Sequence, residues 1–114
     1  ATATMTSTGA ATATEIFTIA NVVFTARASG AVGNEFDVSA TVATQAANIA
    51  AAINASADLV GIVTATSNLG IVTITSVYPG LAGNGIQFSE GLTNVTITQF
   101  TGGTNGTMLE CDLT

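Results

Sequence analysis

One stretch of the chain, residues 39–56, has the hydrophobic period of a helix, and this limits the fold more than any other feature. Its apolar residues are spaced i, i+4, i+7 and i+11, as on one face of a helix. They are Val42, Ala46, Ile49 and Ile53, and the polar Gln45, Asn48 and Asn54 fall elsewhere. The many alanines give the helix little bulk, so it can pack closely against a sheet. We expect one Ala-rich helix here, with Ile49 and Ile53 buried against that sheet.

Strand-type sequence surrounds this helix on both sides. From residue 15 the chain is rich in Val, Ile, Phe and Thr, which suit a pleated, half-buried surface. The expected strands are 15–19, 22–28, 35–39, 59–66, 71–77, 86–90 and 94–100. Residues 67–70 (SNLG) contain the Asn and Gly of a short hairpin loop between two of these strands. This order of elements predicts an α+β fold, with a mostly antiparallel β-sheet and the one Ala-rich helix packed on it.

The first fourteen residues, ATATMTSTGAATAT, contain a single large apolar side chain, that of Met5. Such a segment buries too little surface to offset the entropy lost on ordering it. We therefore expect a flexible N-terminal arm over 1–14, ordered only by a neighbouring chain, to whose sheet edge it would add a strand. A chain of 114 residues is one small domain. That domain is expected over 15–107, followed by a C-terminal tail at 108–114.

The charge of the chain excludes several classes of function. There are seven acidic residues, one arginine (Arg27), no lysine and no histidine, so the formal net charge is −6. A nucleic-acid binder needs Lys and Arg to neutralise phosphates, so no nucleic-acid partner is expected. General acid–base catalysis uses His, Lys or a tuned carboxylate, and two of these three are absent. We therefore expect no enzyme.

The cysteine content and the hydropathy pattern limit how the chain is stabilised and where it resides. Cys111 is the only cysteine, so it forms no intramolecular disulfide and, without histidine, completes no structural zinc site. An unpaired tail residue is expected, with an intermolecular bridge as the alternative. Thr or Asn interrupts every apolar stretch well before about 18 residues, so no membrane partner is expected. Residues 1–14 lack the regions of a signal peptide, which favours a mature or cytoplasmically made chain.

Few residues are candidates for a chemical site. Glu35 and Asp37 are two apart in an expected strand and so share a face, which is the minimum for a calcium site, but no D-x-D-x-D-G loop follows them. The glycine-rich pieces GLAGNG and TGGTNG lack the lysine and the helix of a phosphate-binding loop, and turn formation explains them better. Tyr78 is the only tyrosine and would be the stacking ring of a sugar-binding site. We expect no catalytic residue, no cofactor and no metal.

Four runs of the sequence carry a resemblance to a known family. They are FTIANVVFTARASGAVGNEFDV, TVATQAANIAAAINAS, GIVTATSNLGIVTITSVYPGLAGNGIQF and TITQFTGGTNG. Together they resemble a domain of tailed-bacteriophage structural proteins, including tail-sheath, other tail-associated and head-associated virion proteins. In those proteins an Ala-rich helix ending near Ile-Asn-Ala precedes a Val/Thr hairpin, a Pro-Gly-x-x-Gly-Asn loop and a terminal Thr-Gly-Gly-Thr. The resemblance covers about residues 14–106, and the chain is far too short for a whole sheath subunit.

The resemblance implies a virion structural protein without catalytic residues. We expect a capsid decoration (cement) protein that binds and stabilises the outside of the major capsid lattice, localised to the virion and assembled in the bacterial host cytoplasm. Its partners would be the major capsid protein or other virion subunits. It would also self-associate as a homo-oligomer, because a small domain gains stability from association. The alternatives are a tail tube, sheath-associated or fibre domain and, from a different class, a carbohydrate-binding adhesin module, which Tyr78 would decide.

Overall fold

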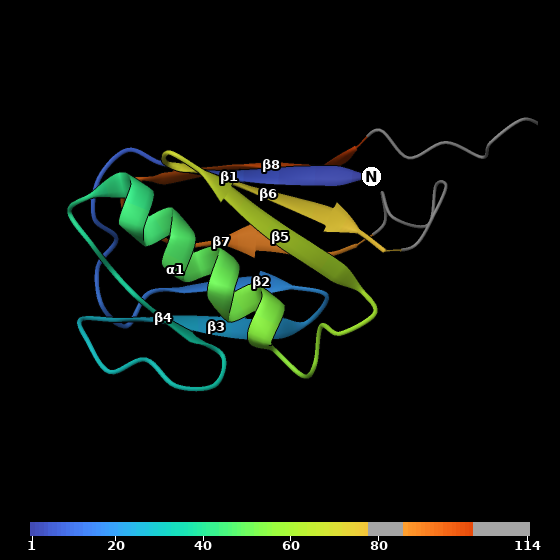
Figure 1. Ribbon diagram of the computed structural model, residues 1–114, viewed down its shortest axis with the longest axis horizontal. Coiled ribbons are helices and arrows are strands. Elements are labelled where there is room, and N and C mark those ends of the chain that lie inside the picture. The colour runs from blue at the N-terminus through green and yellow to red at the C-terminus, as the bar shows by residue number, and fades with distance from the viewer. Residues whose placement is uncertain (78–85, 102–114) are drawn as a thin grey trace, which may run out of the picture.

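Eight β-strands and one helix make up the part of the chain that the computed structural model describes, residues 1–77 and 86–101 (Figure 1). The strands are β1 (Thr2–Ser7), β2 (Ile16–Ile19), β3 (Val22–Arg27), β4 (Glu35–Asp37), β5 (Val63–Asn68), β6 (Ile71–Ser76), β7 (Phe88–Glu90) and β8 (Val95–Thr101), and the helix is α1 (Val42–Ala55). The strands form two sheets, in the orders β5-β6-β1-β8 and β4-β3-β2-β7. The mostly antiparallel α+β class is therefore confirmed, but the single sheet that we predicted is divided into two. The pair β3–β4 is parallel.

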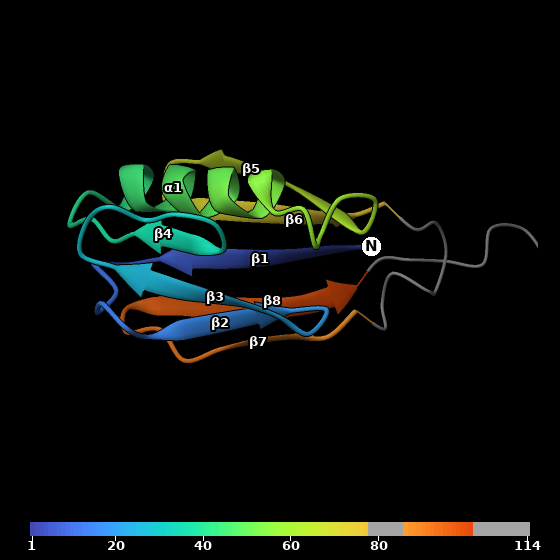
Figure 2. The same ribbon diagram turned by 90° about the horizontal axis from the view of Figure 1, so that it is seen from below.

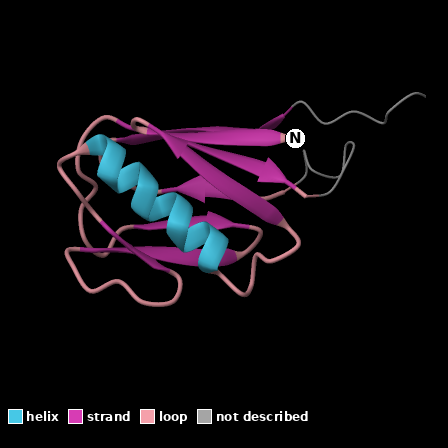
Figure 3. Ribbon diagram, viewed as in Figure 1, coloured by secondary structure: helices cyan, strands magenta, loops and turns pink. Residues whose placement is uncertain are grey.

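The two sheets share one core, and the helix closes it on one side. Phe17 stacks on Phe24 with ring centroids 4.8 Å apart, and both are fully buried. Helix α1 contacts β4 and β5, which are the end strands of the two sheets, as Figures 2 and 3 show. The other two end strands, β7 and β8, meet on the opposite side, where Gln99 Nε2 donates a hydrogen bond to the Phe88 carbonyl at 2.8 Å. The described strands thus enclose the core almost completely.

The first residues of the chain form the central strand β1, which contradicts the flexible arm predicted for 1–14. Strand β1 pairs antiparallel with both β6 and β8. Ala3 and Met5 point into the core and are 1% and 0% exposed. The prediction was wrong because it counted apolar side chains alone, whereas a strand with neighbours on both sides is also held by backbone hydrogen bonds along both of its edges. The domain therefore includes β1 and does not start at residue 15.

The segment between β1 and β2 is also held in place. The Ala11 side chain is 5% exposed, and the Thr14 amide donates to the Ala26 carbonyl at 2.7 Å. The Thr8 amide donates to the Asn94 carbonyl at 2.8 Å. Residues 8–14 are thus tied to both sheets and do not form an arm.

Two short hairpins have residues other than glycine with a positive φ in their loops, namely Ala20, Asn21 and Leu69. Between β2 and β3, Ala20 and Asn21 have φ angles of +51° and +68°, as a two-residue type I′ turn requires. Between β5 and β6 the loop is Leu69-Gly70, so the predicted hairpin is confirmed with a shorter loop than 67–70. A Cβ atom on Gly70 would lie 2.9 Å from the Ser7 carbonyl oxygen, so this turn can approach the end of β1 only with glycine.

The buried face of α1 contains Ala46, Ile49 and Ile53 of the predicted stripe, and it also contains Gln45, Ala50 and Ala52, while Val42 is only partly buried. Ile49 and Ile53 are 0% and 1% exposed, as expected. Gln45, which we expected off the buried stripe, is also fully buried. Its Oε1 accepts from the backbone amides of Ala11 at 2.9 Å and Ser39 at 3.1 Å. Its Nε2 donates to Ser7 Oγ and to the Gly9 carbonyl, both at 3.1 Å.

Two further amide side chains attach α1 to the end strands. Asn48 Nδ2 donates to the Asp37 carbonyl on β4 at 3.0 Å. Asn54 both donates to the carbonyl and accepts from the amide of Ala65 on β5, at 2.7 and 2.8 Å. Strands β4 and β5 have no neighbouring strand on their outer edges, so backbone groups there lack a strand partner. The amide side chains of α1 form hydrogen bonds with some of these groups instead.

The position of β1 predicts a large loss of stability when its core side chain is truncated. Replacing Met5 by Ala should lower the free energy of unfolding by about 2 to 5 kcal/mol, because the truncation leaves a cavity in the core. Urea-induced unfolding measures the change. Thr2→Ala on the same strand is the control, since the exposed Thr2 side chain should contribute less than about 0.5 kcal/mol. Small and equal effects of both substitutions would contradict a core position for β1.

Candidate functional site

The outer face of the first sheet carries the most regular set of side chains in the described residues. Each of its four strands contains the sequence Thr-x-Thr, at 2–6 in β1, 64–66 in β5, 73–75 in β6 and 96–98 in β8. Side chains alternate between the two faces of a strand. Because Met5, Ala65 and Ile74 point into the core, all of these threonines point outward.

The strand register aligns these residues into three rows. The rows are Thr64, Thr75, Thr2, Thr101; then Thr66, Thr73, Thr4, Thr98; then Asn68, Ile71, Thr6, Thr96. We call these twelve positions, ten of which are threonine, the threonine face. A register shift on β8 between the first two rows inserts one extra residue. This bulge leaves Phe100 buried in the core while the outward threonines stay aligned.

The threonine face is a rigid surface of hydroxyl and methyl groups without charge. Thr4 Oγ1 and Thr98 Oγ1 lie 2.8 Å apart in a hydrogen bond, and Thr98 Oγ1 also accepts from the Thr4 amide at 3.2 Å. β-Branched side chains have few χ1 rotamers, so the positions of the hydroxyl groups are well defined. No titratable side chain belongs to this face, so it can bind a partner but holds no acid, base or nucleophile of tuned reactivity.

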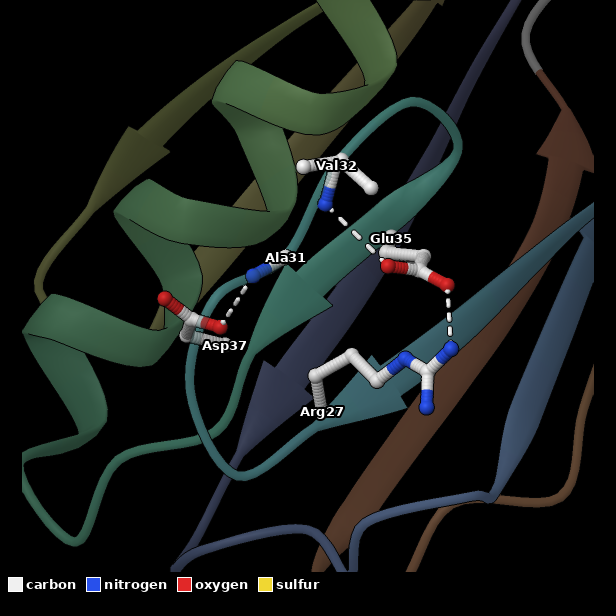
Figure 4. A network of polar contacts seen from close by, with 5 residues as sticks. All are labelled: Arg27, Ala31, Val32, Glu35 and Asp37. Carbon is white, nitrogen blue, oxygen red and sulfur yellow. Dashed lines mark hydrogen bonds and ion pairs between the residues drawn. The ribbon is translucent and has the colours of Figure 1, made fainter.

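The acidic pair that we considered for calcium has a structural role in the described residues (Figure 4). Glu35 Oε2 forms an ion pair with Arg27 Nη2 at 2.8 Å, and Glu35 Oε1 accepts from the Val32 amide at 3.1 Å. Asp37 Oδ1 accepts from the Ala31 amide at 3.0 Å. The two carboxylates therefore hold the loop 28–34. Within residues 1–77 and 86–101, no three acidic, cysteine or histidine side chains gather as metal ligands would.

The hydrogen bonds around Glu35 change its acidity. The hydrogen bond from the Arg27 guanidinium, followed by that from the Val32 amide, lowers the pKa of Glu35 below its ordinary value. The hydrogen bond to Glu35, followed by the negative charge of Glu35, raises the pKa of Arg27 in turn. The pair lies on the surface, so its effect is confined to the loop.

A shallow hollow of about 310 Å³ lies between loop 28–34, β4 and α1. Alanines of the helix form much of its wall, at positions 51, 52 and 55. Its polar lining consists of Glu35 and Asp37, which hold the loop, and Asn48, which bonds to β4. These three polar side chains are therefore engaged in hydrogen bonds that hold the loop and the helix.

Several predicted features lie outside the described residues. Tyr78, Cys111, the loop GLAGNG and all of TGGTNG except its first residue are among them. The carbohydrate-binding alternative and the state of the cysteine thus stay predictions.

Comparison with known proteins assigns no family to this chain. The sequence matches no protein-family model and no curated protein sequence. In the part of the chain that the structure describes, no helix has the length and apolar character needed to cross a membrane. The fold and the site define a β-rich α+β protein with an uncharged threonine face.

Acid should release loop 28–34, because the lowered pKa of Glu35 links its ionisation to the folded loop. A carboxylate with a lowered folded pKa stabilises the fold above its ordinary pKa, and this contribution is lost as the pH falls through the lowered value. In an NMR titration the amide resonance of Val32 should move with a midpoint below the ordinary glutamate pKa. Glu35→Gln should abolish this titration, and Glu90→Gln, far along the chain, should leave it unchanged. A midpoint at the ordinary value would count against the ion pair.

Proposed function

We propose that this chain is a structural component of a tailed-bacteriophage particle, a capsid decoration (cement) protein that binds and stabilises the outside of the major capsid lattice. The observation that carries the proposal is the pair of exposed outer sheet faces, the threonine face and the face of the second sheet that carries Ile16 and Val23, which together suit contact and not catalysis. The resemblance to phage structural domains supports the same conclusion. Its four runs contain most of β2 with β3 and β4, then α1, then β5 and β6, and then most of β8.

Association with a particle would bury apolar side chains that the isolated chain exposes. On the outer face of the second sheet, Ile16 and Val23 are 45% and 48% exposed. Ile71, in the threonine face, is 43% exposed. Contact with the major capsid protein, other virion subunits or further copies of this chain would cover such groups and add stability to a small domain.

A carbohydrate-binding module receives less support from the described residues. Sugar-binding platforms usually expose an aromatic ring that stacks on the sugar. All five phenylalanines are at most 4% exposed. Among residues 1–77 and 86–101 there is thus no aromatic platform on the surface.

The location of the chain on a particle tests the proposal. Antibodies raised against the purified chain should label the heads of particles of the phage that encodes it, when viewed by immunogold electron microscopy. Labelling confined to tails would replace decoration by a tail tube, sheath-associated or fibre role. The absence of label from every particle, with labelled free protein in the same lysate, would overturn a virion role.

The charge of the chain predicts how its attachment responds to salt. A net charge of −6 with a single arginine opposes charge-driven self-association, so lasting contacts must be apolar and backbone contacts. The protein should stay on the particle from 0.1 M to 1 M NaCl, where the Debye length falls from about 10 Å to about 3 Å. Sedimentation of particles followed by quantification of the bound chain measures this. Release at high salt would show instead that acids such as Glu35, Asp37 and Glu90 hold the interface by ion pairs with a basic patch.

A further inference from the structure

We propose that the threonine face binds the surface of ice, because it arranges hydroxyl and methyl groups in a regular two-dimensional array. This inference does not depend on the virion role. Its occupant is a crystal face of frozen water and not a macromolecule.

The spacing of the array follows from sheet geometry. Neighbouring strands lie about 4.8 Å apart, and residues i and i+2 of one strand lie about 6.8 Å apart. The rows Thr66, Thr73, Thr4, Thr98 and Asn68, Ile71, Thr6, Thr96 repeat with these spacings in two nearly perpendicular directions. Oxygen atoms on the faces of hexagonal ice also repeat in two perpendicular directions at closely similar distances. Threonine hydroxyl groups can therefore occupy, or hold water at, successive lattice positions.

Each threonine supplies both groups that such a contact needs. Its hydroxyl group donates one hydrogen bond and accepts up to two, so it can make part of the hydrogen bonds of a water molecule in the lattice. Its methyl group fills the space between hydroxyl groups and releases poorly ordered water when it is covered. Because the χ1 angle is restricted and the sheet holds the backbone, little side-chain entropy is lost on binding.

The centre of the threonine face is held by strands on both sides and by the core beneath it. Strand β1 lies between β6 and β8, and the buried Met5 and Val72 lie on the inner side of the same sheet. Thr4 and Thr98 are joined by a hydrogen bond between their hydroxyl groups. The array is therefore rigid before it meets a crystal.

None of the charged side chains in residues 1–77 and 86–101 belongs to the threonine face. The described charged side chains are Glu15, Arg27, Glu35, Asp37, Asp58 and Glu90. Five of the six belong to the second sheet or lie directly beside its strands, and Asp58 follows α1. A charged group keeps its own hydration shell, which does not match a neutral lattice, so the segregation of charge favours ice as the occupant.

Two other occupants fit the face less well. Its outermost Cα atoms span about 14 Å by about 14 Å at standard spacings. That area is far below the roughly 800 Å² per partner that a stable protein interface buries, so any protein partner, a second copy or the major capsid protein, would need further contacts beyond this face. A crystalline polysaccharide would call for exposed aromatic rings, and the twelve positions of the face contain none.

The twist of the sheet limits the extent of the match. Neighbouring strands rotate by about 20 to 25° relative to each other. In Figures 1 and 2, β1 and β8 run along almost the same axis, whereas in Figure 1 β6 diverges from β1 and β5 is inclined further. The lattice match is therefore best along β1 and β8 and becomes poorer through β6 to β5. The expected activity is inhibition of ice recrystallisation and shaping of crystals, with little depression of the freezing point.

The test compares one threonine on the face with one off it. Thr73, at the centre of the face, and Thr18, on the outer side of the second sheet, are both half-buried threonines on a strand with two neighbours. The purified chain should inhibit recrystallisation in a frozen sucrose film, and Thr18→Tyr should do so at the same concentration. Thr73→Tyr should need at least a tenfold higher concentration, because its ring holds the surface away from the crystal. Thermal unfolding followed by circular dichroism checks that each variant is folded.

A second variant keeps the inference testable if Thr73→Tyr does not fold. Thr96→Tyr changes an exposed position in the outer row of the face and should show the same loss. Exclusion of the unmodified chain from slowly growing ice, or equal activity of folded Thr96→Tyr and Thr18→Tyr, would overturn ice binding. A chain that labels phage heads but is excluded from ice would overturn this inference and leave the virion proposal intact.

Discussion

The buried amide of Gln45 is the interaction on which the two-sheet arrangement depends. One side chain of α1 bonds to the end of β1 through Ser7, to the β1–β2 segment through Gly9 and Ala11, and to Ser39 just before the helix. An unpaired buried amide would cost about 1 to 3 kcal/mol, but here both donors and both lone pairs of Gln45 are used. Strand β1 belongs to one sheet and β2 to the other. Gln45 therefore attaches α1 to the segment of chain that passes from the first sheet to the second.

The position of the helix decides which surfaces are left for contact. Asn48 and Asn54 hold backbone groups of the end strands β4 and β5, so these edges are less open to pairing with another chain. The opposite side is closed by Gln99 and by the Phe88–Phe100 ring pair at 5.8 Å. The outer faces of the two sheets are then the main free surfaces, and one of them is the uncharged threonine face. Both proposals for this chain depend on these two sheet faces being free for contact.

The sequence predicts the local parts of this structure and not the long-range ones. The helical period places Ile49 and Ile53 in the core, and the Leu69-Gly70 turn lies within the predicted hairpin. The N-terminal strand was missed because its partners lie far along the chain: Thr2 pairs with Thr75 and Thr101. Gln45 was misplaced for the same reason, since its partners precede it by as many as 38 residues. The Thr-x-Thr repeats are visible in the sequence, but only the register shows that they align into one face.

Hydrogen exchange at two backbone amides tests the role of Gln45 most directly. The amides of Ala11 and Ser39 belong to no helix or strand, and both donate to Gln45 Oε1. If this side chain holds the helix and both sheets together, these amides should exchange only through an opening with nearly the free energy of global unfolding, as amides in the core strands do. Exchange of both at the rate of an unstructured peptide, while the strands stay protected, would contradict this account.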